Sequence, residues 1–363
     1  MTKFLILVAG LILACVMVLA GCSYWLQSSL TTAKEHDKAE TYITIEKGST
    51  PSQIVAKLAA EGILDSSTPT SIYLRTFGNP AGLKAGDYKF PSPITPLQVL
   101  ALLEKGEERS TRLVIPEGFT RFDIAKRIAE KFPLKQPQTE QEIFALMNDT
   151  SLIRDLAPEA TNLEGYMYPS TYTLSPDATA RDIIKTQVEQ FRKIWKPEWT
   201  TQANAKGMTP HQVITLASLI ETETGVPAER PIVASVIYNR LKKGIPLGVD
   251  QTNVYIAKME GRWDGTINKS DLEVNSPYNT RKRAGLPPGP ISSVSESSIQ
   301  AALNPSTSDY LYYVRNVEAN DGSHWFYSSA SDFERGKAEY QRWLEKERQE
   351  KRANEANSSN VVQ

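Results

Sequence analysis

The apolar residues are concentrated at the start of the chain, where Phe4 to Cys22 form an unbroken run of apolar or small residues. This run reaches the ~18 residues that indicate a membrane-spanning helix and falls just short of the usual ~20. Lys3 and the free amine precede it, which favours a cytoplasmic N-terminus. We therefore predict that residues 1–23 are a membrane anchor or signal segment, with the rest outside the cytoplasm.

Two other interpretations of this segment stay open. A cleaved signal peptide has the same apolar core. Leu19-Ala20-Gly21-Cys22 also resembles a bacterial lipobox, in which the cysteine is lipidated and becomes the mature N-terminus. An uncleaved single-pass helix in the cell (inner) membrane is our main prediction, and a lipoprotein anchored at Cys22 is the alternative. All three interpretations export the remainder of the chain.

A polar tether is predicted at 24–40, and a pattern that occurs twice follows it. Residues 45–59 and 115–129 each contain an apolar strand, a Gly turn, a Thr and an apolar-periodic segment. Thr50 with Gln53, and Thr120 with Asp123, have the spacing of a capping box, so each copy predicts a strand followed by a capped helix. This order resembles the LysM-type glycan-binding module, although a generic capped strand–helix unit explains it equally well.

Two further helices are predicted at 209–224 and at about 228–243, where Gly244 ends the second. Gly86 to Tyr88 predict a turn that enters another strand. After Gly336 the chain consists mainly of Lys, Glu, Arg and Gln. This composition predicts a solvated helix that ends in a charged, disordered tail at 341–363.

Composition narrows the possible chemistry. The formal net charge is −1 with no large basic block, which gives nucleic-acid binding little support. Both cysteines lie in the first segment, so a thiol nucleophile or thiolate metal site is excluded elsewhere. The three histidines lack metal-ligand spacing, and no G-x-S-x-G motif is present. We therefore expect carboxylate chemistry, with no metal and no cofactor.

Two carboxyls close the helix predicted at 209–224. Glu221 borders an apolar stripe beside Ala217 and Ile214, and Glu223 lies roughly 160° away on the helical wheel. A carboxyl beside apolar groups loses hydration, which raises its pKa toward the range of a general acid. Both are equally explained as border residues of an amphipathic helix, and periodicity does not choose between them.

Several other residue types suit a carbohydrate site. Aromatic rings stack on sugar faces, although core packing is their more frequent use. The Pro-rich segment 286–290 is too rigid for a helix or central strand and predicts a shaped loop. The aromatic residues in this part of the chain are Tyr166, Tyr168, Tyr172, Trp263, Tyr278, Trp325 and Phe326.

Seven segments in order resemble the motifs of the YceG-like family, the endolytic murein transglycosylases. The most specific are LEGYMYPSTY at 163–172 and LASLIETET at 216–224. The others are 233–241, 276–280, 285–291, 311–314 and 322–326. The chain departs from the family pattern at Gln251, at Ser293–Ser295 and at Asp332–Phe333, which leaves loop geometry and substrate details open.

The resemblance implies an α+β protein with a membrane helix, a small LysM-like α/β module at 41–110 and a larger mixed catalytic domain at 111–340. In that family the first Glu of the helix motif is the catalytic residue, so the resemblance selects Glu221 over Glu223. Membership of the motifs makes five further residues candidates for substrate binding. They are Glu164, Tyr166, Asn239, Asp250 and Tyr278.

The implied reaction cleaves the β-1,4 bond between N-acetylmuramic acid and N-acetylglucosamine within nascent glycan strands and ends elongation. Glu221 is expected to protonate the leaving oxygen and then deprotonate the muramoyl C6 hydroxyl, which closes a 1,6-anhydro ring. Peptidoglycan strands are the expected partner, and synthases of the elongation or division machinery are candidates. A non-catalytic peptidoglycan-binding scaffold and a hydrolytic muramidase are the alternatives.

Overall fold

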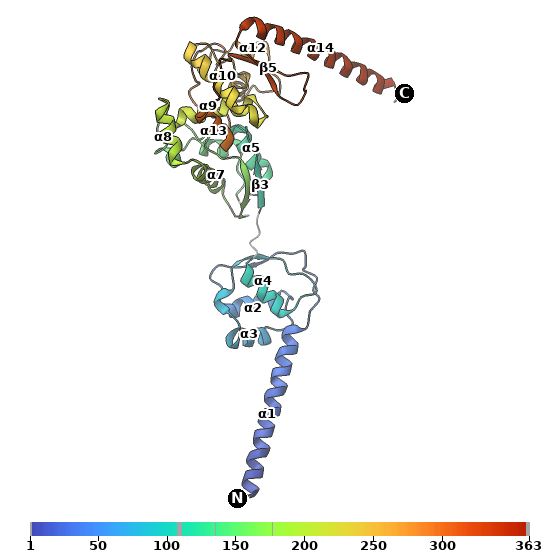
Figure 1. Ribbon diagram of the computed structural model, residues 1–363. Coiled ribbons are helices and arrows are strands. Elements are labelled where there is room, and N and C mark those ends of the chain that lie inside the picture. Colours follow the sequence, from blue (N-terminus) through green and yellow to red (C-terminus); the bar gives the residue numbers. More distant parts are fainter. Residues whose placement is uncertain (1, 107–110, 135, 176, 361–363) are drawn as a thin grey trace. The chain divides into compact units, whose positions relative to one another are not determined.

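The computed structural model describes residues 2–106, 111–134, 136–175 and 177–360. The chain divides into two compact units, one ending at Ser110 and one beginning at Thr111 (Figure 1). The elements of the first unit are α1 (Thr2–Thr31), β1 (Ile43–Ile45), α2 (Pro51–Ala60), α3 (Ser67–Thr76), η1 (Pro80–Gly82), β2 (Gly86–Tyr88) and α4 (Pro96–Lys105).

The N-terminal helix α1 holds one stretch, Gly10–Thr31, that is long and apolar enough to cross a membrane, with a mean hydropathy of 1.7. Its described apolar side chains, such as Leu11 and Leu19, are exposed, which suits a helix surrounded by lipid. The helix does not end near residue 23 as predicted. It continues through Thr31, because Leu30 is buried where α1 packs on α3 and α4.

The rest of the first unit is a small α/β module with its own apolar core. β1 pairs antiparallel with β2, so Gly86–Tyr88, which were predicted as a turn that enters a strand, are themselves a strand. Thr50 and Gln53 form the capping box that starts α2, and Thr95 with Gln98 forms another at α4. The largest side chains of the core are Leu58, Ile63, Tyr88, Phe90 and Leu103.

The second unit is mixed α+β, as predicted. Among the described residues of the chain, the sheets are three antiparallel strand pairs, β1–β2, β3–β4 and β5–β6. Strands and short helices of this unit are β3 (Thr111–Ile115), η2 (Ser151–Ile153), β4 (Ser170–Leu174), η3 (Pro227–Glu229), β5 (Tyr312–Arg315) and β6 (His324–Tyr327). Its α-helices are α5 (Arg121–Lys131), α6 (Glu140–Leu146), α7 (Ala180–Ile194), α8 (Pro197–Ala205), α9 (Pro210–Glu223), α10 (Arg230–Lys243), α11 (Asp250–Met259), α12 (Lys269–Leu272), α13 (Glu296–Leu303) and α14 (Ala330–Asn360).

The second copy of the repeated pattern forms β3 and α5, with Thr120 and Asp123 as the capping box. The two copies therefore have the same local structure but belong to different units. Each strand also pairs with a partner from its own unit, β1 with β2 and β3 with β4. The two copies share the local structure strand, turn and helix, and each copy packs in the core of its own unit.

Helix α9 is the centre of the second unit. It packs on α13, α10, α8 and α11, and every residue from Val213 to Ile220 is buried. The predicted one-sided apolar stripe is therefore wrong, because a helix enclosed by neighbours buries its whole circumference. Gly165 lies against this helix with φ +82°, where an added Cβ would fall 2.8 Å from the Ile214 side chain.

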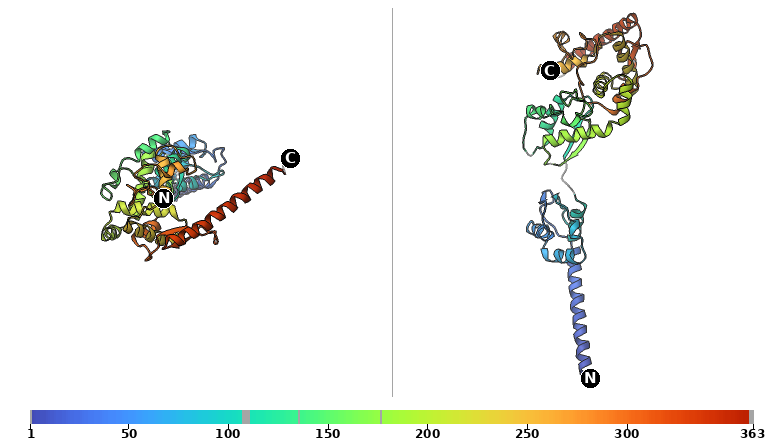
Figure 2. Two further views of the ribbon diagram at one scale, coloured as in Figure 1. Left: turned by 90° about the horizontal axis from the view of Figure 1, so that it is seen from above. Right: turned by 90° about the vertical axis from the view of Figure 1, so that its left-hand side faces the viewer.

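Helix α14 continues to Asn360, so most of the segment predicted as a disordered tail is helical (Figure 2). Lys, Glu, Arg, Gln and Ala are strong helix formers, and Lys346 with Glu350 forms an i,i+4 ion pair at 3.8 Å. This helix propensity and the ion pair favour a helix over the segment that was predicted as a disordered tail.

Candidate active site

The Glu221 carboxylate is enclosed and fully bonded. Arg230 Nη2 donates to Oε1 at 2.9 Å, and Ser295 donates to Oε2 from its backbone N–H at 2.8 Å and from its hydroxyl at 2.6 Å. Only 3% of the Glu221 side chain and 7% of the Arg230 side chain are exposed. These donors hold the carboxyl group in one orientation.

The guanidinium of Arg230 also connects Glu221 to a second carboxyl, Glu117. Arg230 Nη2 lies 3.5 Å from Glu117 Oε2, and Nη1 donates to the hydroxyls of Ser295 and Ser297. Burial and the charge of Glu221 raise the pKa of Glu117, whose side chain is 56% exposed. Arg230 thus joins the loop after β3, the end of α9 and the start of α13, and it holds Glu221 beside a carboxyl that meets solvent.

The Glu223 carboxyl, two residues further along α9, has a different environment. It is buried, and the Tyr313 hydroxyl donates to it. Burial raises the pKa of Glu223, the Tyr313 hydrogen bond opposes that rise, and the negative charge of Asp250 adds to it. Glu223 is also the last residue of α9, where the helix dipole disfavours negative charge. This carboxyl is therefore inclined to hold a proton, and it is bonded to the β5–β6 hairpin rather than open to solvent.

The β5–β6 hairpin covers this end of α9. Its strands pair Tyr313 with Phe326 and Arg315 with His324, so Tyr313 and His324 share one face. His324 Nδ1 lies 2.8 Å from Glu229 Oε2, and its backbone N–H donates to Glu229 Oε1 at 2.7 Å. The end of α9, through Glu223, and the end of η3, through Glu229, are thus both bonded to this hairpin.

Asp250 and Asn239 lie on the Glu223 side of α9. Asp250 begins α11, receives a hydrogen bond from Arg281 Nε at 2.7 Å, and is close enough to Glu223 to affect its pKa. Asn239 donates to the Ser308 and Tyr310 carbonyls at 3.0 and 2.9 Å, which holds the segment leading into β5. Asn239 therefore supports the hairpin, and Asp250 faces the site.

The other three sequence-predicted residues lie away from both carboxyls. Tyr166 is fully buried, with its hydroxyl 2.7 Å from His211 Nδ1 at the start of α9, so it is a core residue. Glu164 is buried and accepts the Arg121 N–H at the start of α5. Burial raises the pKa of Glu164 to about 7. Tyr278 packs on Tyr255 at 5.2 Å and is partly buried.

Comparison with known proteins decides the family. Residues 43–339 match the YceG-like family model. The chain belongs to the YceG-like family.

Two relatives of this YceG-like chain are named endolytic murein transglycosylases. The chain is 31% identical to the endolytic murein transglycosylase of Bacillus subtilis (strain 168), over 82% of this chain and 85% of that one. It is 28% identical to the endolytic murein transglycosylase of Streptococcus pneumoniae serotype 2, over 88% of this chain and 62% of that longer one.

A solved member of the family has a similar fold. The 2.6 Å crystal structure of a yceG-like protein from Listeria monocytogenes aligns with a TM-score of 0.54 and 31% sequence identity. The alignment covers 84% of this chain and 99% of that one.

The functional residues that sequence reasoning missed in this YceG-like chain are the partners of the two carboxyls. Tyr313 and His324 belong to the quoted motifs at 311–314 and 322–326, and Glu117 belongs to the repeated pattern. Membership of these patterns could therefore have identified all three residues as candidates. No pattern marked Arg230, because an Arg beside a Glu at a helix start is common on solvent-exposed surfaces.

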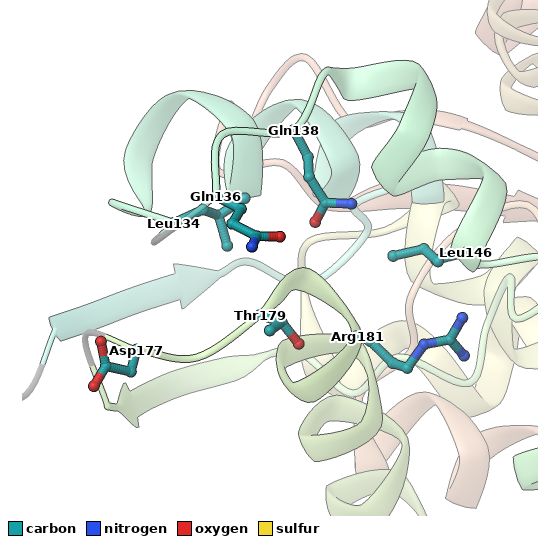
Figure 3. Close-up of a pocket in the computed structure, with 7 residues that line it drawn as sticks. All are labelled: Leu134, Gln136, Gln138, Leu146, Asp177, Thr179 and Arg181. Atoms are coloured by element: carbon teal, nitrogen blue, oxygen red, sulfur yellow. The ribbon is translucent and has the colours of Figure 1, made fainter.

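Two cavities of the second unit lie apart from the carboxyls at the end of α9. One of about 450 Å³ is shown in Figure 3, lined by Leu134, Gln136, Gln138, Leu146, Asp177, Thr179 and Arg181. The other, of about 670 Å³, borders His211 and the Pro-rich loop at Leu286–Pro288. Neither contains Glu221 or Glu223. In the part of the chain that the structure describes, no cluster of three His, Cys, Asp or Glu side chains is suited to a metal ion.

Proposed function

We propose that this chain is an endolytic murein transglycosylase that cleaves the glycan strands of peptidoglycan. The observation that carries the proposal is the match of residues 43–339 to the YceG-like family, with Glu221 of the helix motif held beside Arg230 and Glu117 at the end of α9. The names of the relatives in Bacillus and Streptococcus support the substrate and the reaction class.

We keep Glu221, the first Glu of the helix motif, as the acid–base residue. Its carboxylate is oriented by Arg230 and Ser295 and lies beside the exposed Glu117. A general acid must reach the leaving oxygen, and the geometry of a substrate-free site does not by itself exclude a candidate. Glu223 is buried and bonded to Tyr313 of the β5–β6 hairpin, so we assign it a structural role.

The proposed reaction uses one carboxyl twice. Glu221 gives its proton to the glycosidic oxygen as the bond from muramoyl C1 breaks. The muramoyl C6 oxygen then bonds to C1, and its proton passes to the Glu221 carboxylate, which restores the acid. Arg230 stabilises the carboxylate between the two steps by donating a hydrogen bond to it. The nucleophile is already part of the substrate, which avoids the entropy cost of recruiting water.

Hydrolysis is the second candidate reaction, and Glu117 is the observation that favours it. Glycoside hydrolases ordinarily use two carboxylates. Glu117 and Glu221 both contact the Arg230 guanidinium, so a second carboxyl is present for activating water. The two reactions differ in their products: 1,6-anhydromuramoyl ends are lighter by one water than the reducing ends that hydrolysis leaves. Mass spectrometry of unreduced digests separates them.

We further propose that α1 anchors the protein in the membrane and that the first unit holds glycan as a LysM-like module. The apolar stretch in α1 and the order strand, Gly turn, capped helix in the first unit support these assignments. With an uncleaved anchor, Cys22→Ser leaves membrane association and mass unchanged. A mass change or an accumulated precursor identifies the lipoprotein instead. Synthases of the elongation or division machinery stay candidate partners.

The experiment that tests the function uses the full chain in detergent with purified, uncrosslinked glycan strands. We expect internal cleavage by the wild-type protein, seen as a shift to shorter strands, and none by Glu221→Gln. Absence of cleavage by folded wild-type protein, with glycan binding retained, would favour the scaffold alternative. A binding assay on the same preparation therefore completes the test.

A further inference from the structure

The carboxyl of Glu117 is a group that the proposed transglycosylase reaction does not use. Glu117 Oε2 lies 3.5 Å from Nη2 of Arg230, the same nitrogen that donates to Glu221 Oε1 at 2.9 Å. Only 3% of the Glu221 side chain is exposed, against 56% of the Glu117 side chain. One guanidinium nitrogen thus joins a buried carboxyl to a carboxyl that meets solvent.

The turn that carries Glu117 is fixed to the segment that ends at Ser295. Gly118, with φ +74°, donates its N–H to the Ser293 carbonyl at 3.2 Å, and the Ser293 N–H donates to the Phe119 carbonyl at 2.7 Å. Ser295 in turn donates two hydrogen bonds to the buried carboxyl of the pair. One short segment therefore positions both carboxyls.

The two carboxyls are close enough to hydrogen-bond each other when one of them holds a proton. Two carboxylates this close repel each other, and such pairs commonly share one proton. Burial and the charge of Glu221 raise the pKa of Glu117, and the charge of Arg230 opposes this rise. Glu221 accepts three hydrogen bonds, which favour a carboxylate. In the free protein the proton of the pair therefore lies on Glu117.

We propose that Glu117 is a second catalytic residue, which holds the proton of the pair and passes it to Glu221 when a glycan strand binds. This inference rests on the proposed acid–base role of Glu221. The exposed Glu117 carboxyl meets the strand, and sugar hydroxyls donate to its oxygens. These donors stabilise the Glu117 carboxylate, and Arg230 Nη2, already 3.5 Å away, does the same. The proton therefore moves from Glu117 to Glu221.

The number of protons on the pair is restored in each turnover. Glu117 gives one proton to Glu221 on binding, and Glu221 gives it to the glycosidic oxygen as the bond to muramoyl C1 breaks. The C6 hydroxyl returns one proton to Glu221. Release of the shortened strand removes the hydroxyl donors from Glu117, and the proton goes back to it.

The inference has a consequence for the pH dependence of catalysis. Three further charged or titratable groups face the pair from the surrounding elements: Arg230 from α10, Glu296 from α13 and Tyr168 from the segment before β4. Without the Glu117 carboxyl, the positive charge of Arg230 acts on Glu221 with less opposition. The alkaline limb of the kcat profile should then move to lower pH.

The test measures strand cleavage by variants of the full chain in detergent over a range of pH. Glu117→Gln keeps the size of the side chain and removes its transferable proton. Its kcat at pH 7 should fall by about 10²-fold, the lower end of what an acid–base group contributes. The alkaline limb should move to lower pH, so part of the activity returns at pH 5. Glu117→Asp keeps a carboxyl, so it should keep the wild-type limb with a smaller loss of kcat.

A matched control and a second measurement complete the design. Glu296→Gln removes one negative charge from the start of α13, where that charge is paired with Lys196 at 2.9 Å. It should keep the wild-type kcat and limb. Infrared difference spectra of the free proteins, wild type minus Glu117→Gln at neutral pH, should show the band of one protonated carboxyl. Thermal melts show whether each variant is folded.

The outcomes separate this inference from the proposed function. Near-wild-type cleavage by folded Glu221→Gln overturns the acid assignment and the inference with it. If Glu221→Gln is inactive but folded Glu117→Gln keeps the wild-type kcat or the wild-type alkaline limb, only the inference fails. A difference spectrum without the protonated-carboxyl band likewise rejects Glu117 as the holder of the proton.

Discussion

The last turn of α9 holds two carboxyls that the fold treats in opposite ways. Glu221 receives three donated hydrogen bonds, one of them from the buried guanidinium of Arg230, and lies beside the exposed Glu117. Glu223 is buried, receives one tyrosine hydroxyl and lies near the negative charge of Asp250. Two residues of one type, two positions apart, thus have different partners, and we propose a chemical role for Glu221 and a structural role for Glu223.

The largest effect that tests this comparison is on catalysis. Glu221→Gln keeps the size of the side chain and removes the transferable proton, so kcat should fall by about 10²–10⁴-fold. It also leaves the buried Arg230 charge without its main partner, so unfolding free energy should fall by about 3–5 kcal/mol. Initial rates of strand cleavage and denaturant titration measure both. A folded Glu221→Gln protein with near-wild-type cleavage would reject the assignment.

Glu223 provides the opposite result. Glu223→Gln should keep the activity per folded molecule within a few-fold of wild type. Its melting temperature at pH 8 should be at or above the wild-type value, because the raised pKa makes ionised Glu223 a cost to folding at pH values above its normal range. Initial rates and thermal melts measure both. A fully folded Glu223→Gln protein with no cleavage activity would move the catalytic role to Glu223.

A third buried carboxyl, Glu164, sharpens the comparison through pH. Its pKa is raised from 4.5 to about 7 by burial, so the folded state binds its proton more tightly than the unfolded state does. The stability that this adds is present below pH 4.5 and is lost as pH rises to about 7. The stability of Glu164→Gln relative to wild type should therefore improve between pH 5 and pH 8.

The size of that change follows from the shift of the Glu164 pKa, and is on the order of 3 kcal/mol at most. Denaturant titrations of both proteins at the two pH values give the difference directly. An equal difference at pH 5 and pH 8 would show that Glu164 is ionised throughout.

The smallest effect concerns the hydroxyl that joins Glu221 to α13. Ser295 donates to Glu221 and accepts the Ser298 N–H as the N-cap of α13. Ser295→Ala removes both contacts and should cost about 1 kcal/mol, the usual cost of a lost cap. Cleavage rates should fall by no more than a few-fold, because Glu221 keeps Arg230 and the backbone N–H. A large loss of activity with little loss of stability would place Ser295 in the active site.

Local structure was the part of this fold most accessible from the sequence. The capping boxes at Thr50, Thr120 and Thr209 start helices where their spacing predicted, and Gly244 ends α10 in the left-handed conformation. These signals act within one turn of chain, so they need no tertiary information. The family and the α+β class were also accessible, because motif order is preserved along the chain.

The site depended on contacts that local patterns do not contain. The wheel placed Glu221 and Glu223 on different sides of α9, and the structure agrees, but their partners come from α10, α13 and the β5–β6 hairpin. Tyr166 illustrates the opposite error: it lies in a characteristic motif, yet it packs in the core against Phe191. A motif shows that a residue matters to the family, and only the fold shows whether it meets solvent.

The continuation of α1 into the first unit joins the proposed anchor directly to that unit. Leu30 is buried where the helix packs on α3 and α4, so among the described residues no flexible spacer lies between the helix and the module. On the proposed assignments, a glycan-holding module joined in this way would meet strands close to the membrane.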